Sequence, residues 1–204
     1  MSNQPIEKME KKRVALFFGS FNPIHIGHLA LANYIAEFSS VDEVRFVVSP
    51  QNPFKQNSDL LDDKIRLEMV ASAIAGYAKF SVTDIEFSMP KPSYTCETLR
   101  LLSEQNPDTD FILVMGADNI ENFNKWRNFQ WILDHYALMV YPRPGYSTEH
   151  PAEWENVTIV EAPIFEISST LIRNAIKEGK DVRYFLHHEV MRKIEEGRLY
   201  GFSI

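Results

Sequence analysis

The chain of 204 residues is poor in the features that mark secreted and membrane proteins. It has a single cysteine, Cys96, so no disulfide can form within the chain and a reducing compartment is expected. No apolar run is long enough to cross a bilayer, and residues 1–12 are too polar for a signal peptide. We therefore expect a cytoplasmic protein with no membrane partner, in which a disordered polar tail, residues 1–12, precedes one domain over residues 13–204.

Positive charge is also scarce. The 21 lysines and arginines are outnumbered by 28 acidic residues, which gives a formal net charge of -7 at pH 7. A general nucleic-acid binder needs a basic face to neutralise phosphates, so the composition argues against a nucleic-acid partner. A small anionic substrate needs only a local basic pocket. No internal repeat is evident, and the oligomeric state is left open, a homo-oligomer included.

Short apolar runs alternate with helix-like patterns along the chain. Strands are expected at residues 13–18, 43–49, 80–87, 110–115, 137–141 and 157–161. Helices are expected at residues 28–38, 94–105, 128–135 and 170–177, and in a stretch that Asp62 can cap and in which Ile65, Met69, Ala73 and Tyr77 share one face. This alternation predicts an α/β fold: a Rossmann-like, doubly wound, mainly parallel sheet in one domain with a small C-terminal helical part.

Residues 19–28, Gly-Ser-Phe-Asn-Pro-Ile-His-Ile-Gly-His, lie between the first expected strand and the first expected helix. The start of a helix presents unpaired N–H groups and the positive end of the peptide dipole, so it favours a bound phosphate. His25 and His28 add further donors there, and Gly27 has no Cβ to keep a nucleotide away from the backbone. The segment therefore favours a phosphate site.

Two other interpretations of this segment remain open. A His-x-x-His pair can be half of a metal site, although a third ligand is needed and the other histidines lie far away in the sequence. The segment can also be an ordinary strand–helix turn with two surface histidines.

A second group of polar residues lies near the C-terminus, in Ile-Ser-Ser-Thr-Leu-Ile-Arg at residues 167–173. If Ser168 or Ser169 caps a helix, then Ser169, Thr170 and Arg173 lie within one turn and can face the same anion. The guanidinium supplies a permanent positive charge with a fork that suits phosphate. Taken alone, the same pattern is typical of a capped surface helix with a solvated arginine.

The two segments together carry a resemblance to a known family. Residues 19–28 resemble the (H/T)-x-G-H signature of the nucleotidyltransferase superfamily, with the flanking residues of the nicotinate mononucleotide adenylyltransferases, and residues 167–173 are similar to that family's I-S-S-T-x-I-R motif. The resemblance extends from about Val14 to Gly201. Two motifs in the right order are much harder to meet by chance than either one.

The resemblance implies adenylyl transfer from ATP to nicotinate mononucleotide, which forms deamido-NAD and pyrophosphate in NAD biosynthesis. It implies catalytic roles for His25, His28 and Arg173. It implies ATP contacts from Gly19, Ser20, Phe21, Asn22, Gly27, Lys55, Arg143, Ile167, Ser168 and Ser169. Mg²⁺ is expected as the cofactor, held mainly through the ATP phosphates and without a metal site on the protein.

For the acceptor, the resemblance implies contacts from Tyr94, Thr95, Asp118, Trp126 and Arg127. The Thr95 N–H would meet the nicotinate carboxylate, Asp118 the ribose and Trp126 the pyridine ring. Arg127 is a departure, because many relatives have an aromatic residue at this position. Either its backbone N–H is what matters, or its side chain pairs with the carboxylate and favours the acid over the amide.

Two other functions remain open on the sequence alone. One is a different small nucleotidyltransferase, similar to the phosphopantetheine adenylyltransferases, which share the first motif. The other is a noncatalytic nucleotide-binding sensor with the same fold.

Overall fold

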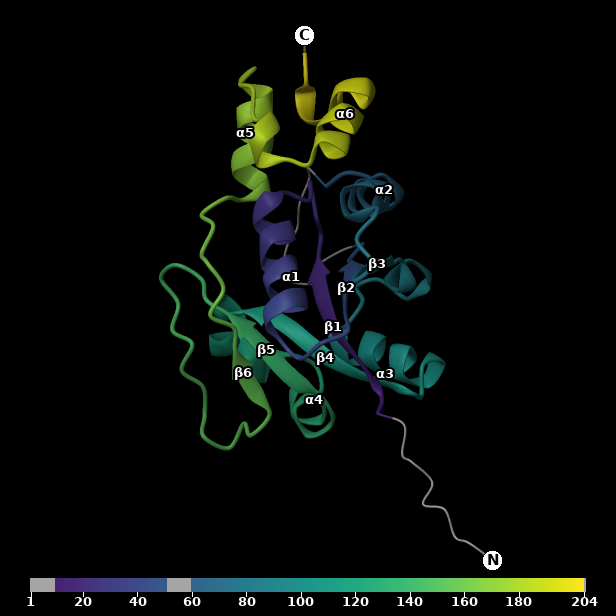
Figure 1. Cartoon of the computed structure of the whole chain (residues 1–204), viewed down its shortest axis with the longest axis vertical. Coiled ribbons are helices and arrows are strands. Elements are labelled where there is room, and N and C mark those ends of the chain that lie inside the picture. The colour runs from purple at the N-terminus through teal and green to yellow at the C-terminus, as the bar shows by residue number, and fades with distance from the viewer. Residues whose placement is uncertain (1–9, 51–59, 204) are drawn as a thin grey trace, which may run out of the picture.

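The computed structural model describes residues 10–50 and 60–203. Within them, six strands form one sheet in the order β3-β2-β1-β4-β5-β6 (Figure 1). The strands are β1 (Lys12–Gly19), β2 (Glu43–Val48), β3 (Phe80–Thr83), β4 (Thr109–Gly116), β5 (Ala137–Tyr141) and β6 (Val157–Ile159). All neighbouring pairs are parallel, which confirms the predicted doubly wound sheet.

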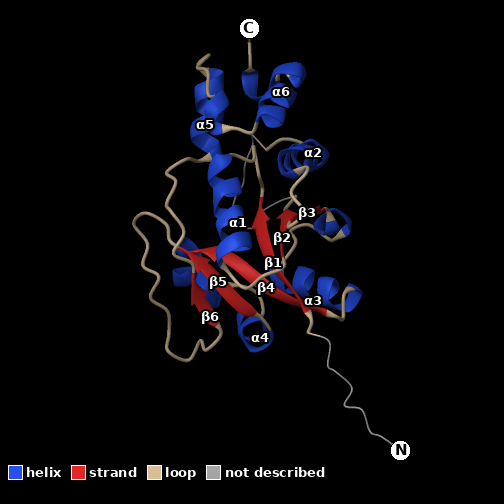
Figure 2. Ribbon diagram, viewed as in Figure 1, coloured by secondary structure: helices blue, strands red, loops and turns tan. Residues whose placement is uncertain are grey.

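Helices cover both faces of the sheet (Figure 2). The α-helices are α1 (Ile26–Phe38), α2 (Asp63–Ile74), α3 (Thr95–Gln105), α4 (Phe129–His135), α5 (Ser169–Lys177) and α6 (His188–Gly197). Short 3-10 helices are η1 (Ile85–Ser88), η2 (Ala117–Lys125), η3 (Arg183–Phe185) and η4 (Leu199–Gly201). None of the helices in the described ranges is long and apolar enough to cross a membrane.

The core is divided by the sheet into two layers. Along β1, Ala15 and Phe17 point into a layer with α1, α2, α5 and α6, whereas Val14 and Leu16 point into a layer with α3, α4 and η2. The alternation follows from the period of two along a strand, and because both faces are covered, the strand is apolar from Val14 to Phe18.

The strand order places a topological switch between β1 and β4. The chain moves from β1 through β2 to β3 on one side, then crosses back and continues from β4 through β5 to β6 on the other. In open parallel sheets, the crevice for ligands lies outside the carboxyl ends of the strands at such a point. Gly19 and Gly116 end β1 and β4 and therefore mark the expected site.

Several predicted boundaries were wrong. The first strand begins at Lys12, inside the segment expected to be a tail; residues 1–9 of that segment lie outside the described residues. β3 ends at Thr83 and not at residue 87, because the chain leaves the sheet after the Val47–Thr83 pair and enters η1 at Ile85. β6 ends two residues early, at Ile159.

Two helices differ from the prediction by more than one residue. α1 begins at Ile26, two residues before the expected start. α2 ends at Ile74, so Tyr77 lies outside it, beyond Gly76 with its positive φ of 86°. The predicted caps fared better: Asp62 accepts a hydrogen bond from the Lys64 N–H, and Ser168 accepts one from the Leu171 N–H.

Candidate active site

The carboxyl ends of β1 and β4 open into a cleft of about 1360 Å³. Pockets for one small ligand are typically about 300–1000 Å³, so this cleft has room for two nucleotides. All the predicted site residues that the structure describes line the cleft: Gly19, Ser20, Phe21, Asn22, His25, Gly27, His28, Tyr94, Thr95, Asp118, Trp126, Arg127, Arg143, Ile167, Ser168, Ser169 and Arg173. The remaining one, Lys55, lies outside the described residues.

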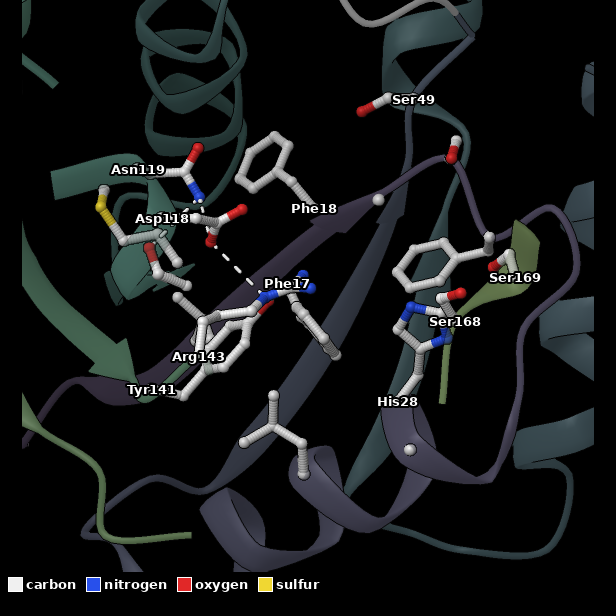
Figure 3. Close-up of a pocket in the computed structure, with 18 of the residues that line it drawn as sticks. Phe17, Phe18, His28, Ser49, Asp118, Asn119, Tyr141, Arg143, Ser168 and Ser169 are labelled. Carbon is white, nitrogen blue, oxygen red and sulfur yellow. Dashed lines mark hydrogen bonds and ion pairs between the residues drawn. The ribbon is translucent and has the colours of Figure 1, made fainter. Parts of the chain in front are cut away.

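His28 lies in the first turn of α1 and faces the cleft (Figure 3). Its Nδ1 accepts a hydrogen bond from the backbone N–H of His25 over 3.3 Å. A neutral imidazole carries one hydrogen, so Nε2 is the protonated nitrogen. His28 therefore has an N–H donor to offer to an anion in the cleft.

His25 is the residue that caps α1, and its ring stacks on that of His28 with centroids 3.7 Å apart. Its Nδ1 is buried and has no hydrogen-bond partner within the described part of the chain. A Cβ on Gly27 would come within 3.1 Å of the His25 ring. The missing Cβ of Gly27 thus leaves room for the His25 ring, and Gly27 itself lines the cleft.

Both histidines are held in the neutral form. Burial and, to a lesser extent, the positive charge of Arg143 lower the pKa of His25 to about 4. Burial, then the neighbouring His25, then Arg143 lower the pKa of His28 well below its ordinary value. At pH 7 the pair therefore contributes N–H donors to a phosphate, and the positive charge has to come from arginines.

Gly19 and Phe21 shape the wall next to His28. Phe21 has a left-handed backbone with φ of 45°, and its ring is buried below Gly19. A Cβ on Gly19 would lie 2.7 Å from that ring, so only glycine fits here. The Phe21 ring also packs edge-on against His28, with centroids 5.2 Å apart. Phe21, predicted as an ATP contact, thus also packs against His28 and helps to fix the position of its ring.

The second motif is hydrogen-bonded to the first. The Ser169 hydroxyl donates to the Pro23 carbonyl over 2.9 Å, and Arg173 Nη1 donates to the Asn22 carbonyl over 2.8 Å. Ser169 has only one hydroxyl hydrogen, and in this structure that hydrogen connects the second motif to the first. Arg173 retains donors, because its buried Nε has no partner among the described residues.

Two residues that hold the first motif were not predicted from the sequence. Arg66 in α2 is fully buried and donates to the carbonyls of Ser20 and Ser49, which follow β1 and β2. Tyr200 near the C-terminus donates its hydroxyl to Asn22 Oδ1 over 2.8 Å. The signal for Arg66 was its helical spacing: it lies three and seven residues before Met69 and Ala73 and shares their buried stripe.

The opposite wall of the cleft is polar. Asp118 and Arg143 form an ion pair with 3.4 Å between Oδ1 and Nε (Figure 3). Arg143 also donates to the Tyr141 hydroxyl over 3.2 Å. A Cβ on Gly116 would lie 2.3 Å from Asp118 Oδ1, so this glycine allows the carboxylate to fold back over the end of β4. A predicted ribose contact and a predicted phosphate contact are therefore paired with each other.

The predicted acceptor residues lie where α3 begins and η2 ends. Tyr94 precedes α3, Thr95 is its first residue, and Trp126 follows η2. Arg127 lies over the Tyr94 ring, with Cζ 4.7 Å from the centroid, and its Nη1 is 3.0 Å from Glu97 Oε1. The guanidinium is thus held beside the start of α3.

Comparison with known proteins agrees with this geometry. The model of the cytidylyltransferase-like family matches residues 16–175. A protein of Cytophaga hutchinsonii named "Probable nicotinate-nucleotide adenylyltransferase" is 50% identical over 93% of this chain and 98% of its own length. A Bacteroides fragilis protein of the same name is 50% identical over 91% of this chain and 92% of its own length. The chain belongs to the nicotinate-nucleotide adenylyltransferase family.

A solved structure supports the fold of this family member. The Plasmodium falciparum nicotinic acid mononucleotide adenylyltransferase complexed with NaAD has a TM-score of 0.79 to this chain. The superposition covers 94% of this chain and 98% of that one at 20% sequence identity.

The side chains at the phosphate end of this adenylyltransferase do not suit a metal. In the described ranges, no group of three or more His, Cys, Asp or Glu side chains is arranged to hold an ion. Mg²⁺ takes oxygen ligands, whereas His25, His28 and Arg173 present nitrogen donors. These donors fit the phosphates of a nucleotide.

Proposed function

We propose that this protein transfers the adenylyl group of ATP to the 5′-phosphate of nicotinate mononucleotide. A phosphate oxygen of the mononucleotide attacks the α-phosphorus of ATP, and the bond from that phosphorus to the bridging oxygen of the β-phosphate breaks. Deamido-NAD forms and pyrophosphate leaves. The attacking phosphate is already an anion, so no general base and no covalent intermediate are required.

The observation that carries this proposal is the joining of two motifs at the end of β1. Neutral His25 and His28 line the same cleft as Arg173, and Arg173 is hydrogen-bonded to the Asn22 carbonyl in the loop that precedes them. Histidine N–H groups bind the triphosphate, and Arg173 stabilises the charge that moves onto pyrophosphate. Catalysis then consists of positioning and charge stabilisation by preorganised donors.

The acceptor end is assigned by the same reasoning. Thr95 at the start of α3 offers its N–H to the nicotinate carboxylate, Trp126 stacks on the pyridine ring, and Asp118 accepts hydrogen bonds from a ribose. Lys55 and Arg143 add charge at the phosphates. Mg²⁺, held through the ATP phosphate oxygens, would neutralise part of their charge. A cytoplasmic location also stays a prediction.

An acceptor panel tests the proposal directly. The protein is mixed with ATP, Mg²⁺ and one acceptor at a time: nicotinate mononucleotide, nicotinamide mononucleotide or phosphopantetheine. We expect pyrophosphate release with nicotinate mononucleotide. Release with phosphopantetheine alone would identify a different transferase, and no release with any of the acceptors would favour a noncatalytic nucleotide sensor.

Arg127 is expected to favour the acid acceptor over the amide. Its guanidinium is about half exposed at the cleft, so we expect Arg127→Ala to lower the acid-to-amide ratio of kcat/KM about fivefold. Arg100→Ala is a matched control, because Arg100 lies over Trp131 with the same 4.7 Å spacing and does not line the cleft. An unchanged ratio in Arg127→Ala would remove this role.

A further inference from the structure

Glu86 is a buried carboxylate that the proposed reaction does not use. It belongs to η1, lines the floor of the cleft and is only 2% exposed. Both of its oxygens accept hydrogen bonds from hydroxyls: Oε2 from Ser93 over 2.9 Å and Oε1 from Thr98 over 2.7 Å. Burial of a carboxylate is costly, and hydroxyl donors with a nearby helix N-terminus offset part of that cost.

The two hydroxyls come from opposite sides of the start of α3. Ser93 lies just before Tyr94, the residue that precedes the helix, and Thr98 lies in its first turn. Both donors are themselves buried, at 5% and 0% exposure. The Thr98 hydroxyl is also 3.4 Å from the Tyr94 carbonyl, a longer contact than its bond to Glu86. One carboxylate thus clamps the chain on both sides of Tyr94 and Thr95.

The clamped segment presents donors to the cleft. The first N–H groups of a helix have no acceptor within it, and the Tyr94 side chain makes no capping bond to them within the described part of the chain. Tyr94 and Thr95 line the cleft where the acceptor carboxylate is assigned. The direction of these N–H groups depends on how the loop before α3 is held.

We infer that Glu86 is a positioning residue for acceptor recognition: through Ser93 and Thr98 it orients the start of α3 toward the carboxylate of the mononucleotide. The inference rests on the proposed function, since it concerns the acceptor of that reaction. Loss of the clamp is expected to weaken acceptor binding and acid selectivity. ATP binding should be unaffected, because the main proposed ATP donors, His25, His28 and Arg173, lie at the start of α1 and on α5.

Three variants test the inference. Glu86→Ala removes both acceptors, whereas Glu86→Gln keeps the shape and one acceptor oxygen. Glu43→Ala is the matched control, because Glu43 is a 6% exposed carboxylate bonded to Lys12, Arg45 and Ser81 at the other end of the sheet. For each, KM is measured for ATP, nicotinate mononucleotide and nicotinamide mononucleotide, together with the melting temperature.

We expect Glu86→Ala to raise KM for nicotinate mononucleotide at least about tenfold and to lower the acid-to-amide ratio of kcat/KM, with KM for ATP within about twofold. Glu86→Gln should stay within about threefold of wild type in every KM, because a hydroxyl can accept from the amide N–H₂. Glu43→Ala should lower the melting temperature without changing the acceptor KM or the acid-to-amide ratio of kcat/KM. If Glu86→Ala fails to fold, Ser93→Ala and Thr98→Val each remove one bond, and each should raise the acceptor KM about threefold.

Other results would overturn the inference. Glu86 would have a purely structural role if Glu86→Ala left the acceptor KM unchanged, if it raised KM for ATP in parallel, or if Glu43→Ala caused the same changes. If Glu86→Ala does not fold, unchanged acceptor KM values in both Ser93→Ala and Thr98→Val would show the same. If the wild-type protein forms no product with nicotinate mononucleotide, the proposed function and the inference fail together. If the wild type does form this product, the proposed function stands and the variants alone test the role of Glu86.

Discussion

Replacing His28 with alanine is expected to lower kcat about a hundredfold, which corresponds to about 3 kcal/mol of transition-state stabilisation. The reason is geometric. The bond from the His25 backbone N–H holds Nδ1 of His28 as an acceptor, so Nε2–H is aimed at the cleft before substrate arrives. A preorganised donor is worth most where charge develops during the reaction. The measurement is kcat at saturating ATP and nicotinate mononucleotide.

Two amide variants serve as controls for this prediction. The amide nitrogen of glutamine reaches about as far as Nε2, whereas that of asparagine reaches only about as far as Nδ1. His28→Gln should therefore recover part of the lost rate, and His28→Asn should resemble the alanine variant. Near-normal kcat in His28→Ala would contradict the assigned role.

Arg66→Met is expected to lower the free energy of unfolding by about 3 kcal/mol. The buried guanidinium donates to the Ser20 and Ser49 carbonyls, as well as to the Leu61 carbonyl and Asp63. Methionine fills much of the space but leaves these acceptors without a donor, and unsatisfied buried acceptors are costly. Because Ser20 begins the loop that bears the histidines, kcat should fall as well. Urea denaturation followed by circular dichroism measures the loss of stability.

Lys64→Met is the control for Arg66. Lys64 is exposed on the same helix, so its replacement should change the free energy of unfolding by less than about 0.5 kcal/mol. If Arg66→Met and Lys64→Met have the same free energy of unfolding, the hydrogen bonds from Arg66 to these carbonyls do not stabilise the fold.

The predictability of this protein differs between its elements. The strands of the sheet could be located because each is a short apolar run between polar segments. β3 was predicted too long, because Ile85 and Phe87 continue its apolar pattern, whereas the chain leaves the sheet after Thr83 and enters η1. Arg66 was missed for a related reason: a charge in a helix is expected to face solvent unless a distant set of acceptors is known.

The roles of individual site residues were less predictable than their membership of the site. Ser169 and Gly27 were both expected to face a ligand. Both line the cleft, but the Ser169 hydroxyl also donates to Pro23, and the room that Gly27 leaves also accommodates the His25 ring. These contacts depend on which neighbour the fold brings closest to the Ser169 hydroxyl and to the space left by the missing Cβ of Gly27.

The sequence by itself determined the alternation of strands and helices, the helix caps and the presence of the two motifs at residues 19–28 and 167–173, because these depend on residues within a few positions of one another. Only the tertiary structure decided how the motifs work together. Asn22 and Pro23 meet Ser169, Arg173 and Tyr200 across 146 to 178 residues of chain. Hydrogen bonds over such separations depend on the packing of whole helices against the sheet, which no local pattern encodes.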